Sequence, residues 1–285
     1  MKSGFVVLAG RSNVGKSSLL NALVSSKVAI VTPKPQTTRR PIRGILHDQR
    51  GQIVFVDTPG IFLGKKDTLS KKLNASVHEH LEGIDVLLYV VDPTREPGEE
   101  EETIQRLVRK ASVPVILIVN KTDLAPEDRP FFDQMRTIDV GQQATVELSA
   151  LKHKDLNTLV DLIFTLLPEG VPYYPDMQFT DMSHKTWLEE LIREKTFLRL
   201  EKELPYSVHV EVTDIDTNER GQKNIEAVIW TTELRYKKMI IGSSAKMIKQ
   251  IGIDARKELE AATNEKIHLA LRVDVDEKWP LKFQL

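Results

Sequence analysis

Short apolar runs alternate with longer mixed segments along the first 170 residues. The runs lie at residues 5–9, 53–56, 86–91, 113–119 and 145–148. Residues 86–91 and 115–119 are apolar without interruption, which is typical of central strands in a parallel sheet covered on both faces. The segments at 18–23, 70–80 and 99–110 have the composition of helices. This alternation predicts an α/β fold with a mostly parallel sheet and crossover helices.

The pattern changes after a proline-rich break at residues 168–176. The features that follow are a helix at 183–203, strands at 207–213 and 225–232, an apolar pair at 240–241, a turn of small residues at 242–245, a helix at 246–262 and a strand at 267–275. The sequence therefore predicts a first domain at 1–170, a linker at 171–180 and a second, α+β domain at 181–285.

Composition narrows the classes of protein that fit. A chain of 285 residues is long enough for two domains with separate cores. Its net charge is −1, so a nucleic-acid site would have to be a local patch. The absence of cysteine excludes disulfides, thiolate zinc sites and cysteine nucleophiles. No leader pattern is visible, and the apolar runs are far shorter than the ~20 residues of a membrane span, so we expect a cytoplasmic protein.

Residues 10–17 read Gly-Arg-Ser-Asn-Val-Gly-Lys-Ser, a complete G-x-x-x-x-G-K-[ST] phosphate-binding loop. The loop follows a predicted strand and precedes a predicted helix, as the motif requires. Its backbone N–H groups and the helix N-terminus form a positive cradle for a di- or triphosphate. Lys16 adds a point charge near the β- and γ-phosphates, and Ser17 offers a hydroxyl to Mg²⁺.

A second motif, Asp-Thr-Pro-Gly at residues 57–60, follows the next predicted strand. An aspartate at a strand end can hold Mg²⁺, usually through water, and the Gly60 N–H can meet a γ-phosphate. These residue types also favour turns, so the motif gains its meaning from its place after the phosphate-binding loop.

Two further motifs predict which base is bound. Residues 120–123 are Asn-Lys-Thr-Asp. Asp123 can accept from the N1–H and the 2-amino group of guanine, a donor pair that adenine lacks. Asn120 can bridge to the base and the Lys121 stem can lie over its face. In the Ser-Ala-Leu triplet after the next strand, the Ala150 N–H could meet the guanine O6.

Four motifs in this order resemble the GTPase domain of Ras-like P-loop proteins, and in particular the Era family of bacterial GTPases. The likeness extends to Gln-Thr-Thr-Arg at 36–39, Tyr-Tyr-Pro at 173–175, Ile-Arg-Glu-Lys at 192–195 and Glu-Leu-Pro-Tyr-Ser-Val at 203–208, so it covers essentially the whole chain. The family has Pro where this chain has Ser12 and commonly Thr where it has Ser18; neither residue supplies an essential ligand.

The resemblance implies a set of nucleotide-binding residues in these motifs. They are Gly10, Arg11, Ser12, Asn13, Val14, Gly15, Lys16, Ser17, Ser18, Asp57, Thr58, Pro59, Gly60, Asn120, Lys121, Asp123, Ser149, Ala150 and Leu151. Catalytic roles are implied for Lys16, Thr38, Asp57 and Gly60. The implied cofactor is Mg²⁺, with Ser17, Thr38 and Asp57 as its ligands.

A polar stretch at 32–41 resembles a switch loop that orders around the γ-phosphate. The switch residues are Gln36, Thr37, Thr38, Arg39 and Arg40. By resemblance Thr38 is the better candidate for Mg²⁺, with Thr37 adjacent. A second mobile segment is expected from Gly60 to about residue 73.

Two residues bear on the rate of hydrolysis. Ile61 stands where Ras-like enzymes have a Gln that orients the attacking water, so we expect slow intrinsic turnover. The alternative is a nucleotide binder with negligible turnover. In some related GTPases the Asn equivalent to Asn13 helps to hold K⁺ as a cationic aid to the transition state. Asn13 is therefore a candidate K⁺ ligand, and the alternative is that it only shapes the loop.

The order of elements in the second domain resembles a type II KH domain, which clamps about four nucleotides of single-stranded RNA against a Gly-x-x-Gly loop. Ala replaces the second glycine here, and both residues between are Ser. The predicted RNA-binding residues are Gly242, Ser243, Ser244, Ala245, Lys246 and Lys249. Ile241, Ile248 and Ile251 are expected to pack in the core, and the alternative, by resemblance to the family, is that apolar residues here line a groove against the bases. The alternative is that the altered loop has lost RNA binding and the domain binds protein.

The resemblance implies a monomeric switch that binds and hydrolyses GTP. It also implies binding to the 3′ end of the 16S rRNA through the KH domain, in support of small ribosomal subunit assembly. The alternative is a GTP-dependent switch with a degenerate KH domain that acts on protein partners or peripherally at the inner membrane. The sequence has no strongly apolar amphipathic helix and no dense polybasic run that would support binding to a membrane surface.

Overall fold

The computed structural model describes residues 1–35, 37–59, 83–219 and 221–282. The chain forms two compact units, Met1–Asp181 and Met182–Leu285, and each has a sheet of its own. Within the described residues, no helix combines the length and the apolar character that crossing a membrane requires.

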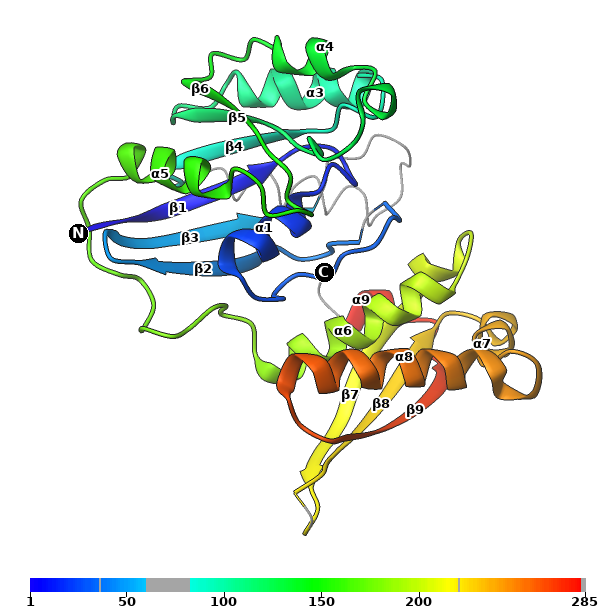
Figure 1. Cartoon of the computed structure of the whole chain (residues 1–285). Coiled ribbons are helices and arrows are strands. Elements are labelled where there is room, and N and C mark those ends of the chain that lie inside the picture. Colours follow the sequence, from blue (N-terminus) through cyan, green and yellow to red (C-terminus); the bar gives the residue numbers. More distant parts are fainter. Residues whose placement is uncertain (36, 60–82, 220, 283–285) are drawn as a thin grey trace. The chain divides into compact units, whose positions relative to one another are not determined.

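The first unit is built on a six-stranded sheet in the order β2-β3-β1-β4-β5-β6 (Figure 1). Its strands are β1 (Lys2–Ala9), β2 (Ile42–Asp48), β3 (Gly51–Asp57), β4 (Val86–Val91), β5 (Val115–Val119) and β6 (Ala144–Glu147). Neighbouring strands are parallel except for β2, which pairs antiparallel with β3. The prediction of a mostly parallel sheet is confirmed, and each of the five predicted runs overlaps a strand.

The edge strand β2 is the one that the apolar pattern did not predict. It reads Ile-Arg-Gly-Ile-Leu-His-Asp, and its last three positions are half-exposed. An edge strand that is only partly covered needs no continuous apolar run, so its composition resembles that of a loop.

Helices pack against the sheet so that β4 and β5 are buried at every position, as predicted for central strands. The helices of this unit are α1 (Lys16–Val24), α3 (Glu99–Val108), α4 (Phe132–Arg136) and α5 (Leu156–Leu166), with a 3₁₀ turn at Pro126–Asp128. α1 contacts β2, β3 and α5, whereas Ile104 and Val108 of α3 pack with Leu87 of β4 and Leu117 of β5. The helix predicted at 70–80 lies outside the described residues.

The topology brings the sequence motifs to one edge of the sheet. The phosphate-binding loop follows β1 and Asp57 ends β3, while Asn120 and Ser149 come after β5 and β6. Carboxyl ends of parallel strands meet at the same edge, which is where ligands bind in sheets of this kind. The same edge receives Asp92, directly after β4.

Residues 173–181 lie along β2 and β3 and belong to the first unit. The side chain of Gln52 accepts from the backbone N–H groups of Tyr173 and Tyr174 and donates to the carbonyl of Tyr174. The Ile45 N–H donates to the Phe179 carbonyl at 2.9 Å. The segment expected to be a linker therefore makes specific backbone contacts with the first sheet.

The second unit has the order helix, two strands, two helices and a strand. Its elements are α6 (His184–Arg199), a 3₁₀ turn (Leu204–Ser207), β7 (Val208–Thr217), β8 (Lys223–Thr231), α7 (Leu234–Ile241), a 3₁₀ turn (Ser243–Ala245), α8 (Lys246–Thr263), β9 (Ile267–Val275) and α9 (Trp279–Lys282). β8 is the central strand, antiparallel to β7 and parallel to β9 (Figure 1). α6 and α8 pack against each other, and they contact β7 and β9 respectively.

The first helix of this unit ends earlier than predicted. Ser183 caps its start by accepting from the Thr186 N–H at 3.1 Å. The helix ends at Arg199, four residues before the predicted end at 203. Leu200 is extended, with φ −90° and ψ 152°, so the helix ends there; Pro205 lies in the first turn of the following 3₁₀ segment, where its missing N–H leaves no hydrogen bond unmade.

Candidate functional site

The phosphate-binding loop is folded around Gly15 and held by Asn120. Gly15 has φ 99°, and a Cβ there would lie 2.3 Å from the Asn120 Nδ2 atom. That amide donates to the Val14 carbonyl at 2.9 Å, and its oxygen accepts from the Ala150 N–H at 3.1 Å. Asn120 therefore joins the phosphate-binding loop to the 149–151 loop, a bracing role that its predicted contact with the base would add to.

Lys16 begins α1 and lies buried within the loop. Its Nζ donates to the carbonyls of Gly10 at 2.9 Å and Arg11 at 2.8 Å. Desolvation by burial lowers the pKa of Lys16 to about 8, against the opposing influence of Asp57 and Glu101. A bound phosphate would place a negative charge beside this desolvated ammonium group, whose hydrogen-bond acceptors here are neutral carbonyls. The loop is therefore a good phosphate site.

Three side chains predicted to hold Mg²⁺ converge. Ser17 Oγ donates to Asp57 Oδ2 at 2.5 Å, and Thr38 Oγ1 lies 3.1 Å from Ser17 Oγ and 3.3 Å from Asp57 Oδ2. Asp57 is 0% exposed and its Oδ1 has no hydrogen-bond partner among the described residues. Burial raises its pKa, although Lys16, Ser17 and Thr38 oppose the rise. Hard oxygen donors around an unsatisfied buried carboxylate oxygen fit Mg²⁺.

The two switch threonines have different surroundings. Thr37 Oγ1 donates to the Lys34 carbonyl at 2.7 Å and lies 2.6 Å from Thr32 Oγ1, whereas Thr38 faces Ser17 and Asp57. This geometry supports Thr38 as the Mg²⁺ ligand. Arg39 is buried and Arg40 is exposed.

Several predicted switch positions are outside the described residues. They are Gln36, Gly60, Ile61 and the segment to about residue 73.

The base-binding motif lies across the pocket from the switch loop. Lys121 Nζ forms an ion pair with Asp92 Oδ2 at 2.5 Å. Asp123 is exposed, and its Oδ1 accepts from Ser149 Oγ at 2.5 Å. Ser149 thus orients the carboxylate that is predicted to select guanine. The Ala150 N–H, predicted to meet the base, donates here to Asn120.

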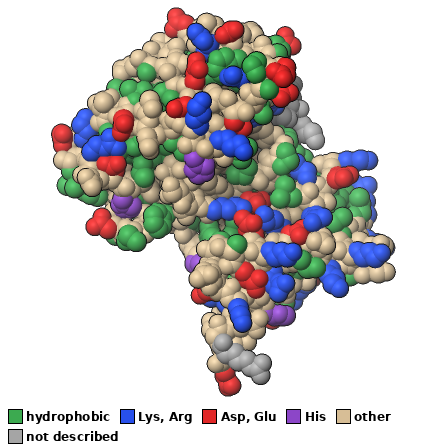
Figure 2. All heavy atoms as spheres, in the orientation of Figure 1, with side chains coloured by type: hydrophobic (Ala, Val, Ile, Leu, Met, Phe, Trp, Pro, Cys, Tyr) green, Lys and Arg blue, Asp and Glu red, His purple; other side chains and the backbone are tan. Residues whose placement is uncertain are grey.

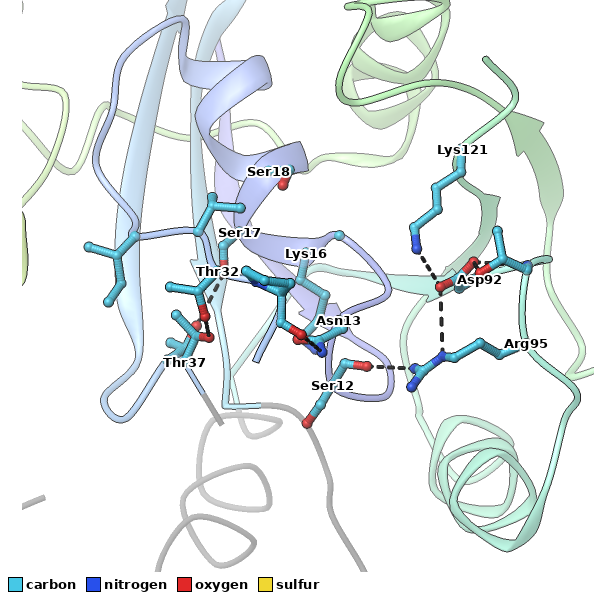
Figure 3. Close-up of a pocket in the computed structure, with 16 residues that line it drawn as sticks. Ser12, Asn13, Lys16, Ser17, Ser18, Thr32, Thr37, Asp92, Arg95 and Lys121 are labelled. Atoms are coloured by element: carbon cyan, nitrogen blue, oxygen red, sulfur yellow. Dashed lines mark hydrogen bonds and ion pairs between the residues drawn. The ribbon is translucent and has the colours of Figure 1, made fainter. Parts of the chain in front are cut away.

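These elements surround a cavity of about 480 Å³. Predicted residues in its wall are Ser12, Asn13, Gly15, Lys16, Ser17, Ser18, Thr37, Thr38 and Lys121. Figure 3 shows Ser17 and Thr37 on one side of it and Lys121 on the other. Leu151 is not part of the wall and is 73% exposed.

Sequence reasoning missed part of this wall. The additional residues are Ile30, Val31, Asp92, Thr94 and Arg95, whereas Thr32 and Pro33 belong to the predicted switch stretch at 32–41. The position of Asp92 directly after an apolar strand was a usable signal, because the other motifs occupy equivalent positions.

Asn13 has a positive φ of 66° and donates from Nδ2 to the Pro33 carbonyl at 2.6 Å. It therefore connects the phosphate-binding loop to the start of the switch loop. Its side-chain oxygen has no hydrogen bond to the described residues, so the contact with Pro33 leaves that oxygen available to a cation.

In the second unit, the altered loop keeps a left-handed turn. Gly242 has φ 73°, and Ser244 and Ala245 have φ 49° and 58°. A left-handed alanine costs about 1 kcal/mol that glycine would not. The loop therefore holds its shape without the second glycine, at some strain, and leads directly into α8.

A groove of about 450 Å³ runs from this loop between α8 and β9. Its lining combines apolar side chains with cations and comprises Ser244, Ala245, Ile248, Lys249, Gly252, Ile253, Arg256, His268, Leu269 and Leu271. Lys246 is exposed at the start of α8 but is not in the lining. Ile251 is buried as predicted, whereas Ile248 was expected in the core and instead lines the groove.

Basic side chains lie over the second unit, with acidic ones interleaved among them (Figure 2). Lys237 pairs with Asp274 at 3.0 Å, and Arg235 pairs with Glu233 at 2.6 Å. These pairs reduce the net positive charge of α7. Lys249 and Arg256 are therefore the cations best placed to meet a phosphate backbone, because they line the groove.

Replacing Gly242 with alanine should destabilise the second unit by about 2 kcal/mol. Besides the left-handed strain, a Cβ there would lie 2.8 Å from the Met247 Cβ. Urea unfolding followed by tryptophan fluorescence measures this, because all three tryptophans, Trp187, Trp230 and Trp279, lie in that unit.

Gly221→Ala is the matched control for this substitution. Gly221 has φ 72° and nothing within 4 Å of an added Cβ, so it should lose only about 1 kcal/mol from strain. Equal losses in the two variants would contradict the claim that close approach to Met247 requires the glycine.

Known families and structures match both units. A family model described as 50S ribosome-binding GTPase matches residues 5–121, and a KH domain model matches residues 203–280. GTPase Era of Halothermothrix orenii is 40% identical over 278 residues, spanning 98% of this chain and 94% of that protein. GTPase Era of Thermoanaerobacter sp. is 42% identical over 287 residues, spanning 98% and 92%.

The chain belongs to the Era family of GTPases.

Solved Era structures match the same extent of the chain. The crystal structure of Era in complex with MgGDPNP and nucleotides 1506–1542 of 16S ribosomal RNA has a TM-score of 0.89 and 34% identity, and the match covers 98% of this chain and 95% of that one. An Aquifex aeolicus Era variant bound to GDP·AlF₄⁻ gives the same values. The Era family match confirms a P-loop GTPase fold followed by a KH domain.

Proposed function

We propose that this protein is a GTP-hydrolysing switch that binds 16S rRNA near its 3′ end and assists assembly of the small ribosomal subunit. The observation that carries the proposal is the convergence of Ser17, Thr38 and Asp57 beside Lys16, at the edge of a cavity that reaches Lys121. The relative solved with MgGDPNP and an rRNA fragment supports the same pairing of functions.

The chain's own residues divide the work of binding. The N–H groups of loop 10–17 and Lys16 hold the phosphates, and Asp123, oriented by Ser149, selects guanine. Ser17, Thr38 and Asp57 would hold Mg²⁺, which neutralises charge developing on the β- and γ-phosphates. Thr38 belongs to the switch loop, so its place beside Ser17 and Asp57 links loop order to the γ-phosphate.

A turnover assay on the full chain tests the enzymatic part. GTP should be converted to GDP and phosphate slowly, in a reaction that EDTA stops, and ATP should not be hydrolysed. Equal hydrolysis of ATP and GTP would contradict the assignment of Asp123 as the guanine-selecting residue.

Turnover should be about tenfold faster in K⁺ than in Na⁺ at the same ionic strength. The side-chain oxygen of Asn13 would help to place K⁺ near the transferred phosphate, where the charge of the cation stabilises the transition state. Phosphate release in KCl and NaCl, with wild type and Asn13→Ala, measures the effect. Asn13→Ala should hydrolyse GTP at the same rate in the two salts. Identical wild-type rates in KCl and NaCl would contradict the proposed role of Asn13 as a K⁺ ligand.

The groove beside Gly242–Ala245 supports RNA as the ligand of the second unit. Apolar Ile248 and Leu271 can contact bases, while Lys249 and Arg256 can contact phosphates. The rival proposal, a protein- or membrane-directed switch with a degenerate KH domain, is not favoured, because Era in the RNA complex matches 98% of this chain. We also propose that the protein is a cytoplasmic monomer. The hydrophobic core that each unit buries on its own supports the monomer.

A further inference from the structure

The turn after β4 contacts both the base-binding loop and the phosphate-binding loop. Asp92, which is 1% exposed, accepts from Lys121 Nζ at 2.5 Å and from the N–H and hydroxyl of Thr94 at 2.9 and 2.7 Å. Its two oxygens are thus both engaged, which fixes the carboxylate. The lysine of the Asn-Lys-Thr-Asp motif is consequently held from the side of β4.

Arg95 continues this connection toward the phosphates. Its Nη2 donates to the Ser12 carbonyl at 2.7 Å, and its Nε lies 3.8 Å from Asp92 Oδ2. A chain of contacts therefore runs from Lys121 through Asp92 and Arg95 to Ser12, along the wall of the nucleotide cavity (Figure 3). A planar guanidinium can hold two acceptors that lie in different directions, whereas an ammonium group is a point charge.

The segment that carries Arg95 is itself fixed to the phosphate-binding loop. Arg11 donates to the Glu96 carbonyl at 3.0 Å and forms a buried ion pair with Glu101 of α3 at 2.6 Å. Tyr89 of β4 donates its hydroxyl to the same Glu101. Arg95 is thus presented to Ser12 from a rigid support, although its own side chain remains 44% exposed.

We propose that Arg95 is a positioning residue that joins the base-binding loop to the phosphate-binding loop and slows the release of bound nucleotide. The inference rests on the proposed function, since it assigns a role within the same GTP site. A nucleotide that spans the cavity is held at both ends, and it leaves when one end opens. The Arg95–Ser12 contact opposes the separation of the two ends at the exposed wall, whereas Asn120 opposes it from a buried position.

The test is the rate at which a fluorescent GDP dissociates from the full chain when excess GDP is added. Arg95→Gln should speed dissociation about tenfold, as expected for the loss of one charge-assisted hydrogen bond. Association should keep its rate and the nucleotide-free protein its melting temperature, because Arg95 is partly exposed. Arg95→Lys should recover part of the loss.

Two comparisons distinguish a positioning role of Arg95 from a non-specific destabilisation of the protein. Arg109→Gln is the matched control, because Arg109 also donates to a backbone carbonyl, that of Asp139, but lies outside the cavity wall. It should dissociate GDP at the wild-type rate. In an Asp92→Asn background, Arg95→Gln should have a smaller effect than in wild type, since the two residues act as one unit.

The possible results separate the positioning role of Arg95 from the proposed GTP-binding function on which it rests. Wild-type protein that binds GDP, together with unchanged dissociation from Arg95→Gln, would overturn the positioning role alone. An equal increase in the GDP dissociation rate of Arg109→Gln would also overturn it. So would effects of Arg95→Gln and Asp92→Asn on that rate that are fully additive. Failure of the wild-type protein to bind GDP at all would overturn the proposed function and this inference with it.

Discussion

Replacing Lys16 with methionine should reduce GTP turnover by about a thousandfold without destabilising the nucleotide-free protein. Lys16 is buried between the carbonyls of Gly10 and Arg11, and desolvation lowers its pKa to about 8. Its charge therefore disfavours the folded state when no phosphate is bound, and favours the complex when one is. Methionine keeps an apolar stem of similar length and removes both effects.

The pH dependence of stability tests the buried charge separately. Lysine in the unfolded chain titrates near 10.5, so between pH 8 and 10.5 the unfolded state binds more protons than the folded state. In that window, deprotonation of Lys16 should therefore increase the free energy of unfolding of nucleotide-free wild type as the pH rises. Lys16→Met should lack this increase. Urea unfolding followed by circular dichroism measures both proteins.

Lys110→Met is the matched control, because Lys110 is exposed after the end of α3. It should keep turnover and the wild-type pH dependence. Turnover retained in Lys16→Met, or a marked loss of stability in that variant at pH 7, would contradict the described role of Lys16.

Replacing Asp123 with asparagine should weaken GTP binding by about a hundredfold and favour xanthosine triphosphate instead. The carboxylate of Asp123 accepts from two guanine donors, and an amide nitrogen at that place would face them with a donor of its own. Xanthine carries an oxygen where guanine has the 2-amino group, so it accepts where guanine donates. Ser149 can still donate to the amide oxygen of the variant, which keeps the side chain oriented.

Competition of GTP and xanthosine triphosphate against a fluorescent guanine nucleotide measures this change. Asp128→Asn, at an exposed position in the 3₁₀ turn of the same connection, should bind GTP as wild type does. An Asp123→Asn variant that still prefers GTP would show that another group selects the base.

The sequence predicts those parts of the molecule that depend on local pattern. The continuous apolar runs at β4 and β5 identify buried parallel strands, and the phosphate-binding loop is recognisable because its glycines and lysine have fixed spacing. β2 was missed because an edge strand that is half-covered needs no such run. Ile248 was misplaced because helical periodicity does not distinguish a groove from a core.

The contacts between motifs depend on tertiary structure and could not be predicted. The amide of Asn120 contacts Val14 and Ala150, which are distant in sequence, and the motif itself gives no sign of these contacts. Likewise, no local pattern couples Arg95 to Ser12 across 83 residues. By contrast, the proximity of Ser17 to Asp57 follows from the topology, because parallel strands carry both motifs to one edge of the sheet.

The central claim, a GTP switch coupled to RNA binding, is tested most directly by fluorescence anisotropy. A labelled oligonucleotide from the 3′ end of 16S rRNA is titrated with the full chain, with a non-hydrolysable GTP analogue or GDP, at two salt concentrations and beside a scrambled oligonucleotide. The account predicts sequence-dependent binding that is about tenfold tighter with the GTP analogue, and therefore an equal gain in GTP affinity from RNA. Absence of binding, or weak salt-sensitive binding that ignores sequence and nucleotide, would contradict it.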